Sequence, residues 1–219
     1  MIAVIGGVLG KKEVAALRGA AAGIEFIDGR ATAGRYARDV KNNEQATKSR
    51  KADAILEKAR NALMENEVFR SVARPRKFTR LLLSRYRPGM EYGAHVDDAI
   101  MAGARSDLSF TLFLSDLDAY EGGGLVMHEA VEDRLFRPDP GQAVLYPTSV
   151  THRVEAVTHG ERLAVVGWVQ SWVRDPERRE VLHDLDVATA SMFARLGKTP
   201  EFDRLQNAKT NLYRMWADG

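Results

Sequence analysis

The feature that most constrains this chain is a succession of short β-leaning segments between residues 78 and 173. Each is rich in β-branched, aromatic or alternating apolar residues, and together they cover residues 78–86, 108–114, 124–128, 134–136, 143–146, 152–157 and 162–173. Turn signals separate them at Arg87-Pro88-Gly89, Glu121-Gly122-Gly123-Gly124, Asp139-Pro140-Gly141 and Thr158-His159-Gly160-Glu161. About seven or eight short strands at this spacing predict a double-sheet jelly roll, which has a natural binding site between its sheets.

Helical patterns flank this β-rich zone. Residues 11–22 and 52–66 lean helical, and a polar, loop-like stretch from 28 to 50 lies between them. After Asp175, Pro176 fits a first helical turn, Gly197 can end that helix and Pro200 begins a last one. Residues 1–9 are expected to form a first strand. The prediction is a mainly β fold with flanking α-helices: a support region (1–77), a double-stranded β-helix (jelly-roll) core (78–174) and a C-terminal helical region (175–219).

Composition excludes several classes of site and partner. The 219 residues include no cysteine, which rules out disulfides, cysteine-ligated zinc and cysteine nucleophiles. The net charge is only +2, with acidic and basic residues interleaved, so a dense basic face for nucleic acid is not expected. The start of the chain has no basic leader, and no stretch reaches the roughly 18 apolar residues of a membrane span. We expect a cytoplasmic protein that does not enter membranes.

A His-x-Asp pair, His95 and Asp97, lies on a segment expected to be extended. Side chains alternate along a strand, so the imidazole and the carboxylate project to the same side. One further histidine would complete a two-His-one-carboxylate triad, which holds Fe(II) on one face and leaves positions open for O2 and a cosubstrate. His152, which opens a later strand, is the expected third ligand, and His128 is its one rival.

The alternative is that these histidines do not bind a metal. A lone His-x-Asp pair is common by chance, and a single histidine near a strand is more often a hydrogen-bonded core or surface residue. The complete order favours the metal site: the pair, a β-rich interval, His152 and then Arg162 on the next strand. His159 and His183 are not needed for it and are expected to be solvated.

Arg162 is the candidate for the cosubstrate. 2-Oxoglutarate chelates iron through its keto acid end, and a planar guanidinium can bind its far carboxylate through two parallel hydrogen bonds. The alternative is a surface arginine paired with a nearby glutamate, but the strand that follows is strongly apolar and an arginine within it needs a buried partner. His152 and Arg162 are expected on neighbouring antiparallel strands joined by the turn at His159 and Gly160. The Tyr86 hydroxyl is expected to reach the same carboxylate, with Tyr92 as the alternative or as a packing residue.

These residues stand in stretches that resemble prolyl 4-hydroxylase-like dioxygenases, namely residues 83–97, 141–147, 152–154 and 157–162. The chain is more narrowly similar to bacterial PKHD-type hydroxylases, through residues 28–34, 40–45, 112–116 and 211–213. The resemblance implies iron ligands at His95, Asp97 and His152, a 2-oxoglutarate contact at Arg162, and L-ascorbate as an auxiliary reductant. One departure is Gly124, where the family usually has Glu, and it is expected to change a loop beside the substrate mouth.

The expected reaction is hydroxylation of an unactivated C–H bond by O2, with 2-oxoglutarate converted to succinate and CO2. The primary substrate is unidentified, and the resemblance suggests a prolyl or lysyl side chain or a related small molecule. One alternative is nucleic-acid demethylation, but such dioxygenases carry a further arginine just beyond the cosubstrate arginine, and residues 163–168 contain none. The other is a non-catalytic jelly-roll protein that senses 2-oxoglutarate or a metal.

Two segments keep alternative interpretations. Residues 28–45 either fold over the barrel mouth and select the substrate, or leave Lys41-Asn42-Asn43 as a solvated loop. The C-terminal helices, with Tyr213 and Trp216 near the end, either cover the barrel or make a contact between copies of the chain in a homo-oligomer.

Overall fold

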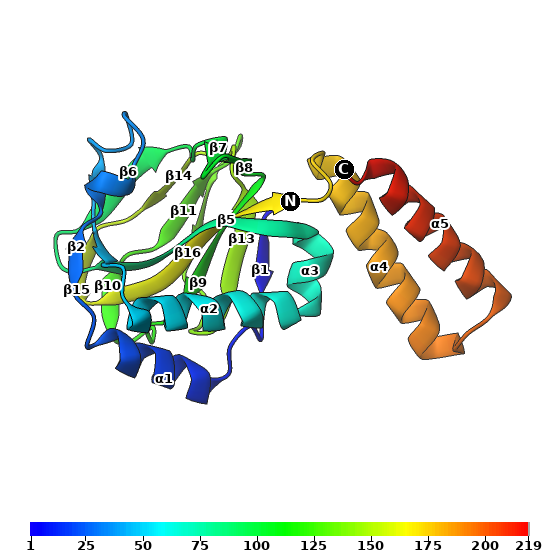
Figure 1. The fold of residues 1–219 in the computed structure, drawn as a ribbon, viewed down its shortest axis with the longest axis horizontal. Helices are drawn as coiled ribbons and strands as arrows, with labels where there is room; N and C mark the ends of the chain where they lie inside the picture. Colours follow the sequence, from blue (N-terminus) through cyan, green and yellow to red (C-terminus); the bar gives the residue numbers. More distant parts are fainter. Residues whose placement is uncertain (219) are drawn as a thin grey trace.

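The computed structural model describes residues 1–218 and arranges most of the strands in two antiparallel sheets that face each other (Figure 1). The larger, here the major sheet, runs in the order β1 (Ala3–Ile5), β13 (Ala143–Pro147), β9 (Leu108–Phe113), β16 (Arg162–Ser171), β5 (Pro75–Tyr86), β4 (Glu44–Ala46) and β2 (Phe26–Asp28). The smaller, here the minor sheet, runs in the order β12 (Asp133–Phe136), β11 (Leu125–His128), β14 (His152–Val154), β6 (Glu91–His95) and β3 (Lys41–Asn42). Two further pairs are β10 (Tyr120–Gly122) with β15 (Val157–Gly160), and β7 (Ile100–Met101) with β8 (Ala104–Arg105). The predicted fold class is confirmed.

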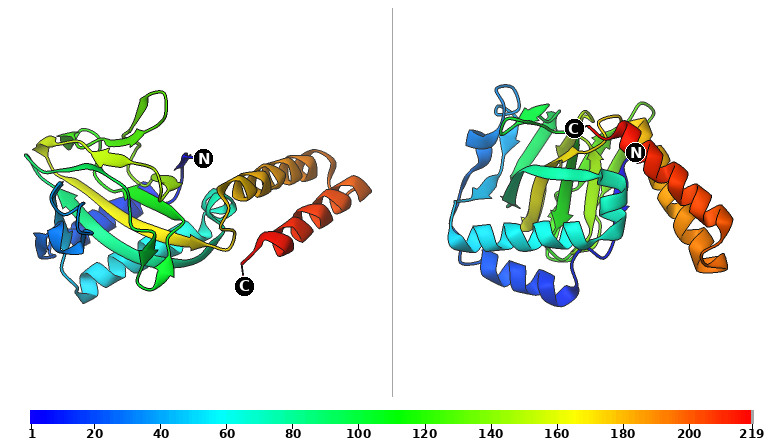
Figure 2. Two further views of the ribbon diagram at one scale, coloured as in Figure 1. Left: turned by 90° about the horizontal axis from the view of Figure 1, so that it is seen from above. Right: turned by 45° about the vertical axis from the view of Figure 1, so that its right-hand side comes forward.

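Helices cover the outer face of the major sheet. They are α1 (Lys11–Ala21), α2 (Arg50–Glu65) and α3 (Glu67–Ala73), and a short 3-10 turn, η1 (Gly29–Thr32), follows β2. The Ser49 hydroxyl caps α2 by accepting a hydrogen bond from the Ala52 N–H at 3.2 Å. Buried Ile55, Ala59 and Leu63 then recur at helical spacing and face the sheet. Figure 2 shows the resulting layers: helices, major sheet, minor sheet.

The major sheet is therefore buried on both faces, and two apolar cores result. All six residues of β9 are buried, because one face of this strand meets the helices and the other meets the minor sheet. The first core lies between the helices and the major sheet, and includes Leu63, Phe69, Phe110 and Leu112. The second lies between the two sheets and includes Phe113, Leu125, Met127, Val144 and Tyr146.

Two local predictions need correction. The stretch predicted as a loop, residues 28–50, holds η1, β3 and β4, so this segment adds an edge strand to the minor sheet and an inner strand to the major sheet. The predicted strand 152–157 is two strands: β14 pairs in the minor sheet, whereas β15 pairs with β10. The chain leaves the minor sheet between them at residues 155 and 156, and the Val157 N–H donates to the Met90 carbonyl.

A helical hairpin ends the chain. The Asp175 carboxylate caps α4 (Pro176–Leu196), Pro176 occupies its first turn as predicted, and Gly197 ends it with a φ of 68°. The last helix, α5 (Pro200–Trp216), packs against α4 and has no buried residue. The hairpin points away from both sheets (Figure 2), so it does not cover the barrel. Contact between copies of the chain stays a prediction. None of the helices in residues 1–218 is long and apolar enough to cross a lipid bilayer.

The predicted turn at Gly141 generates a test of this packing. Gly141 has a φ of 87°, and a Cβ there would lie 2.3 Å from the Leu9 carbonyl oxygen. Gly89 has a similar φ of 82° but open space around it. We expect Gly89→Ala to cost roughly 1–2 kcal/mol of unfolding free energy, from backbone strain alone. Gly141→Ala should cost about 1–3 kcal/mol more, because the segment between β1 and α1, which holds Leu9, must also shift. Urea denaturation of both variants measures the difference, and equal losses would contradict the packing described.

Candidate functional site

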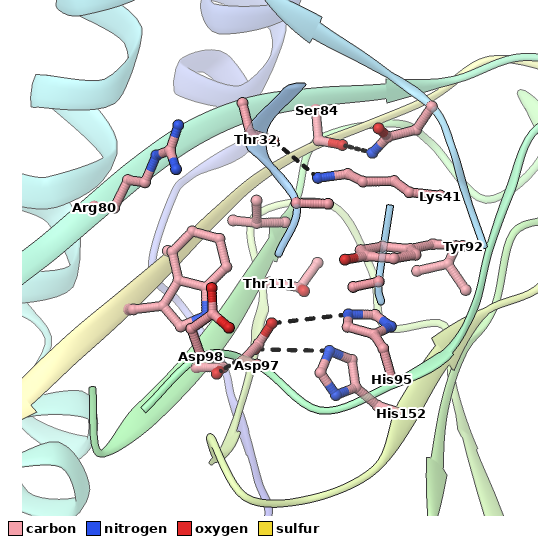
Figure 3. A pocket seen from close by; sticks show the side chains of 18 of the residues that line it. Thr32, Lys41, Arg80, Ser84, Tyr92, His95, Asp97, Asp98, Thr111 and His152 are labelled. Atoms are coloured by element: carbon pink, nitrogen blue, oxygen red, sulfur yellow. Dashed lines mark hydrogen bonds and ion pairs between the residues drawn. The ribbon is translucent and has the colours of Figure 1, made fainter. Parts of the chain in front are cut away.

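A cavity of about 440 Å³ lies between the two sheets, a size typical of small-molecule sites. Its walls come from β5, β9 and β16 of the major sheet, from β6 and β14 of the minor sheet, and from the segments around residues 32–45 and 96–102. Figure 3 shows the polar side chains that point into it. The segment predicted to fold over the mouth does line the cavity, and the alternative of a solvated loop is wrong, because Lys41 and Asn43 are buried.

His95, Asp97 and His152 converge at one point in this cavity. His95 ends β6 and His152 opens β14, and the two are register partners in the minor sheet. Asp97 lies two residues past the end of β6. One Asp97 oxygen is 3.7 Å from His95 Nε2, the other is 3.7 Å from His152 Nε2, and the three ligand atoms lie within 4.8 Å of one another. Each 3.7 Å separation is shorter than about 4 Å, twice the usual ligand-to-metal distance, so one cation can touch both partners.

Backbone carbonyls fix both imidazoles in the form that binds a metal. His95 Nδ1 lies 2.8 Å from the Gly93 carbonyl oxygen, and His152 Nδ1 lies 3.0 Å from that of Val150. A carbonyl only accepts, so each Nδ1 carries a proton, and in a neutral ring the lone pair is on Nε2, the atom that faces Asp97. Burial, and then the neighbouring His152, lower the pKa of His95 to about 4, which keeps this ring neutral near neutral pH.

Two further residues hold the triad in place. The Ser109 hydroxyl on β9 donates to Asp97 at 2.7 Å and so orients the carboxylate. The Tyr92 ring stacks on the His95 ring with centroids 3.6 Å apart and an angle of 16° between the planes. Tyr92 therefore packs against His95, which agrees with its interpretation as a packing residue. Contacts of this kind fix ligand geometry and raise metal affinity.

Arg162 faces the triad from the other sheet. It opens β16 in the major sheet and is 1% exposed, yet its Nε and Nη2 have no hydrogen-bond partner. The rings of Tyr86 and Phe113 flank the guanidinium, with centroids 5.2 and 5.0 Å from its central carbon. Burial lowers the pKa of Arg162, but a guanidinium stays charged in proteins. A buried, charged fork of unpaired donors is a site for an anion.

Tyr86 lies beside Arg162, as its register partner on β5. Its hydroxyl is hydrogen-bonded to Asn43 and Ser84, and the Asn43 amide itself donates to the Ser84 hydroxyl at 3.0 Å. Burial raises the pKa of Tyr86, so the hydroxyl keeps its proton and can donate to an anion at Arg162.

The predicted relation between His152 and Arg162 is wrong. They were expected on neighbouring strands joined by a turn at His159 and Gly160, but His152 lies in the minor sheet beside His95, and Arg162 lies in the major sheet. The cause is the departure of β15 from the minor sheet, which carries the chain across the sandwich before β16 begins.

The other histidines and Gly124 lie outside the convergence point. His128, the rival ligand, ends β11 and lies 2.7 Å from an oxygen of Asp133, and His159 is exposed as predicted. His183 is half-buried and 2.8 Å from the Ser71 hydroxyl, so the prediction that it is solvated is wrong. Gly124 does not line the cavity; a Cβ there would lie 2.3 Å from Leu135.

Sequence reasoning missed Ser109 and the orientation of Lys41. Ser109 and Thr111 alternate with Leu108, Phe110 and Leu112 on a fully buried strand. Polar residues at every second position of such a strand are a signal for a polar inner face. Lys41 comes from the edge strand β3, which approaches β6 closely because Gly93 has no side chain; a Cβ there would lie 2.8 Å from Val40.

Lys41 is a buried cation at the cavity wall. It is 6% exposed, and its Nζ donates to the Thr32 hydroxyl at 3.0 Å. Burial, and then the charge of Arg80, lower the pKa of Lys41 to about 8. Its Nζ lies 5.0 Å from the centroid of the Tyr92 ring, whose other neighbour is His95.

Comparison with known proteins agrees with this geometry. Residues 81–170 match the 2OG-Fe(II) oxygenase superfamily, and residues 176–218 match the PKHD-type hydroxylase C-terminal domain. A PKHD-type hydroxylase of Maricaulis maris is 52% identical over 193 residues, which is 88% of either chain. Another, from Acaryochloris marina, is 47% identical over 219 residues and the full length of both chains.

Solved structures show the same fold at low sequence identity. A Pseudomonas putida prolyl-4-hydroxylase has a TM-score of 0.53 at 21% identity, over 78% of this chain and 92% of that one. A Trichoplax adhaerens prolyl hydroxylase, solved with a peptide from a hypoxia-inducible factor, has a TM-score of 0.60 at 15% identity, over 83% and 86%.

The lowered pKa of Lys41 predicts a pH-dependent stability difference. Between about pH 8 and 10.5 the unfolded chain holds a proton that the folded chain has lost. The buried charge of Lys41 therefore lowers the unfolding free energy by its full amount below pH 8, and by less and less as the pH rises above 8. Relative to Lys41→Met, the wild type should gain up to about 1.4 kcal/mol of unfolding free energy per pH unit in this window. Urea denaturation at several pH values measures it. Lys77→Met, at an exposed lysine of β5, is the control; a wild-type curve parallel to that of Lys41→Met would contradict the burial of the charge.

Proposed function

The chain belongs to the PKHD-type hydroxylase family of 2OG-Fe(II) oxygenases, and from this membership we propose that it hydroxylates an unactivated C–H bond of a prolyl or lysyl side chain or of a related small molecule. The family implies Fe(II) and 2-oxoglutarate, with O2 as the second cosubstrate. Three parts of the proposal go further: the residues assigned to iron and 2-oxoglutarate, the hydroxylation itself, and L-ascorbate as an auxiliary reductant.

The donor set fits ferrous iron. Two neutral imidazole nitrogens and one carboxylate are the ligand types of non-heme Fe(II) oxygenases, and they leave coordination positions open. We assign the metal to His95, Asp97 and His152. Iron bound there would supply the activation of O2 that is coupled to decarboxylation of 2-oxoglutarate to succinate and CO2.

The unpaired guanidinium of Arg162 is the observation that carries the proposal. It faces the same cavity as the triad, and nothing in the described chain neutralises it. We assign it the far carboxylate of 2-oxoglutarate, with the Tyr86 hydroxyl as a second donor. A non-catalytic sensor of 2-oxoglutarate or a metal could use the same residues, so the two functions are distinguished by turnover.

The remaining residues orient these groups and keep water out. Ser109 holds the Asp97 carboxylate, Tyr92 holds the His95 ring, and Phe113 and Tyr86 enclose the guanidinium in an apolar setting. A dry, shaped cavity strengthens each charged contact and limits side reactions. The oxygen atom that does not enter succinate is expected to enter the product as a hydroxyl group.

Turnover separates an oxygenase from a sensor. The Fe(II)-loaded protein should release succinate and CO2 from 2-oxoglutarate slowly even without a primary substrate. His152→Ala, which removes one expected ligand, should abolish this release. Absence of decarboxylation by the iron-loaded wild type would favour the sensor.

Replacing Arg162 tests the assignment of the cosubstrate carboxylate. Arg162→Ala leaves that carboxylate buried and unpaired, which should cost on the order of 2–5 kcal/mol. The affinity for 2-oxoglutarate should fall roughly 30- to 4,000-fold. Isothermal titration in the presence of Mn(II) measures it, with Arg195→Ala on the exposed face of α4 as the control. Unchanged binding in Arg162→Ala would remove this residue from the site.

Ser109→Ala tests the support of the metal ligands. Loss of the hydrogen bond to Asp97 frees the carboxylate to rotate, and metal affinity should fall about 10- to 100-fold with the fold intact. Competition with a metallochromic chelator measures the affinity, and Ser191→Ala on α4 is the matched control. If both variants bound Fe(II) like the wild type, the hydroxyl would have no role in holding Asp97.

A further inference from the structure

The outer part of the cavity holds cationic groups that the cosubstrate does not use. Along the paired strands β5 and β16, Arg162 lies opposite Tyr86 and Trp168 lies opposite Arg80. Six residues separate these two pairs, so Arg80 and Trp168 lie about 20 Å from Arg162 along the sheet. Lys41 lines the same cavity from β3, the strand next to β6. We name Lys41, Arg80 and Trp168 the outer subsite.

Lys41 has no acidic partner within 4.0 Å among the described residues, although it is 6% exposed. The Thr32 hydroxyl at 3.0 Å is its hydrogen-bond acceptor. A lysine that is almost fully buried is normally paired with an anion, because removing an ammonium group from water is costly. The Tyr92 ring, whose centroid is 5.0 Å from Nζ, and the charges of Asp97 and Asp28 offset part of that cost, but none of them forms an ion pair with Lys41. The ammonium group can therefore still pair with an anion.

Arg80 and Trp168 add further donors. In Figure 3 the side chains of Arg80 and Lys41 reach toward the same region from different walls, with Thr32 between them. Arg80 is an exposed residue that makes no ion pair with the described residues, and its charge lowers the pKa of Lys41. The indole N–H of Trp168 is buried without an acceptor. All three residues line the same cavity.

Acidic side chains also act on the outer subsite. Asp98 lines this part of the cavity wall, exposed and beside Gly34. The charges of Asp97 and Asp28 raise the pKa of Lys41, but neither carboxylate forms an ion pair with it, and Asp97 is assigned to the metal. At the inner end, Arg162 is already assigned to 2-oxoglutarate.

The position of Lys41 relative to the triad suits recognition of a substrate. Tyr92 lies between the two, with its ring 5.0 Å from Lys41 Nζ and 3.6 Å from the His95 ring. A group held by Lys41 is therefore within a small molecule's length of the point where the three ligands converge.

We propose that Lys41, Arg80 and the Trp168 indole bind an oxyanion, a carboxylate or a phosphate group, of the primary substrate. The substrate is thus an anionic molecule, held by this group while its reacting C–H bond lies near the triad. The inference rests on the proposed function for the location of that bond. The binding of an oxyanion by Lys41, Arg80 and Trp168 does not itself depend on the proposed function.

The test measures binding of simple oxyanions to the full-length protein. The protein is loaded with Zn(II), which is diamagnetic, and saturated with N-oxalylglycine, a 2-oxoglutarate analogue that occupies Arg162. Labelling with ¹⁵N-tryptophan gives three indole signals, from Trp168, Trp172 and Trp216, which Trp→Phe variants assign. Acetate and methylphosphonate are the probes, and acetamide is the neutral counterpart of acetate.

We expect acetate or methylphosphonate to shift the Trp168 signal saturably, with no saturable effect of acetamide. The probe that binds more tightly tells carboxylate from phosphate. Lys41→Met and Arg80→Met should each weaken binding about tenfold or more, since each removes a charged hydrogen bond. Lys41→Arg should keep most of the affinity, and Lys77→Met should match the wild type. The midpoint of thermal unfolding of Lys41→Met should not fall, because no paired structural charge is lost.

Several results would overturn the proposal. One is an equal response of the Trp168 signal to acetate and acetamide, and another is no saturable response to acetate or to methylphosphonate. A third is oxyanion binding that is unchanged in Lys41→Met, which is the result expected if the oxyanion binds directly to the metal. A lower unfolding midpoint in Lys41→Met with unchanged binding would make Lys41 a structural residue. Titration of N-oxalylglycine separates this failure from that of the proposed function: if it binds the wild type and Lys41→Met alike, the cosubstrate site stands whatever the oxyanions do.

Discussion

The structure depends on charges enclosed between two apolar sheets. Arg162 and Lys41 are almost fully buried, and neither has an acidic partner within ion-pairing distance in residues 1–218. An unpaired buried charge opposes folding by several kcal/mol, so the sandwich must be stable enough to carry both. The double burial of the major sheet, by helices outside and by the minor sheet inside, supplies that stability. The same arrangement makes the enclosed donors strong anion sites, because electrostatic attraction is stronger in apolar surroundings than in water.

The two sheets contribute different residues to the site. The minor sheet carries the two imidazoles on adjacent strands, and each Nδ1 atom is hydrogen-bonded to the backbone carbonyl two residues earlier in the chain. The major sheet carries Ser109, which orients Asp97, and Arg162. The minor sheet would thus bind a cation, and the major sheet would bind a dicarboxylate from the opposite side of the cavity. The family of 2OG-Fe(II) oxygenases to which the chain belongs implies that pair of ligands.

Much of this could be predicted from the sequence, because it depends on local patterns. Period-two alternation and turn residues predict the strands, and the same alternation predicts His95 and Asp97 on one side, although Asp97 lies beyond the end of β6. Which sheet a strand joins is not local. The break at residues 155–156 moves Arg162 to the opposite wall from His152, and only long-range pairing decides that. Lys41 was equally hidden, since a polar run becomes buried only when β3 pairs with β6 at Gly93. The residues of the site could thus be predicted from the sequence, whereas the sheet that carries each of them could not.

The most direct measurement is a crystal structure with Mn(II) and N-oxalylglycine, recorded near the manganese absorption edge. The account predicts one anomalous peak, bonded to His95 Nε2, Asp97 and His152 Nε2. It also predicts that the far carboxylate of N-oxalylglycine receives two hydrogen bonds from Arg162. Manganese bound elsewhere, or an analogue whose carboxylate lies away from Arg162, would contradict the account.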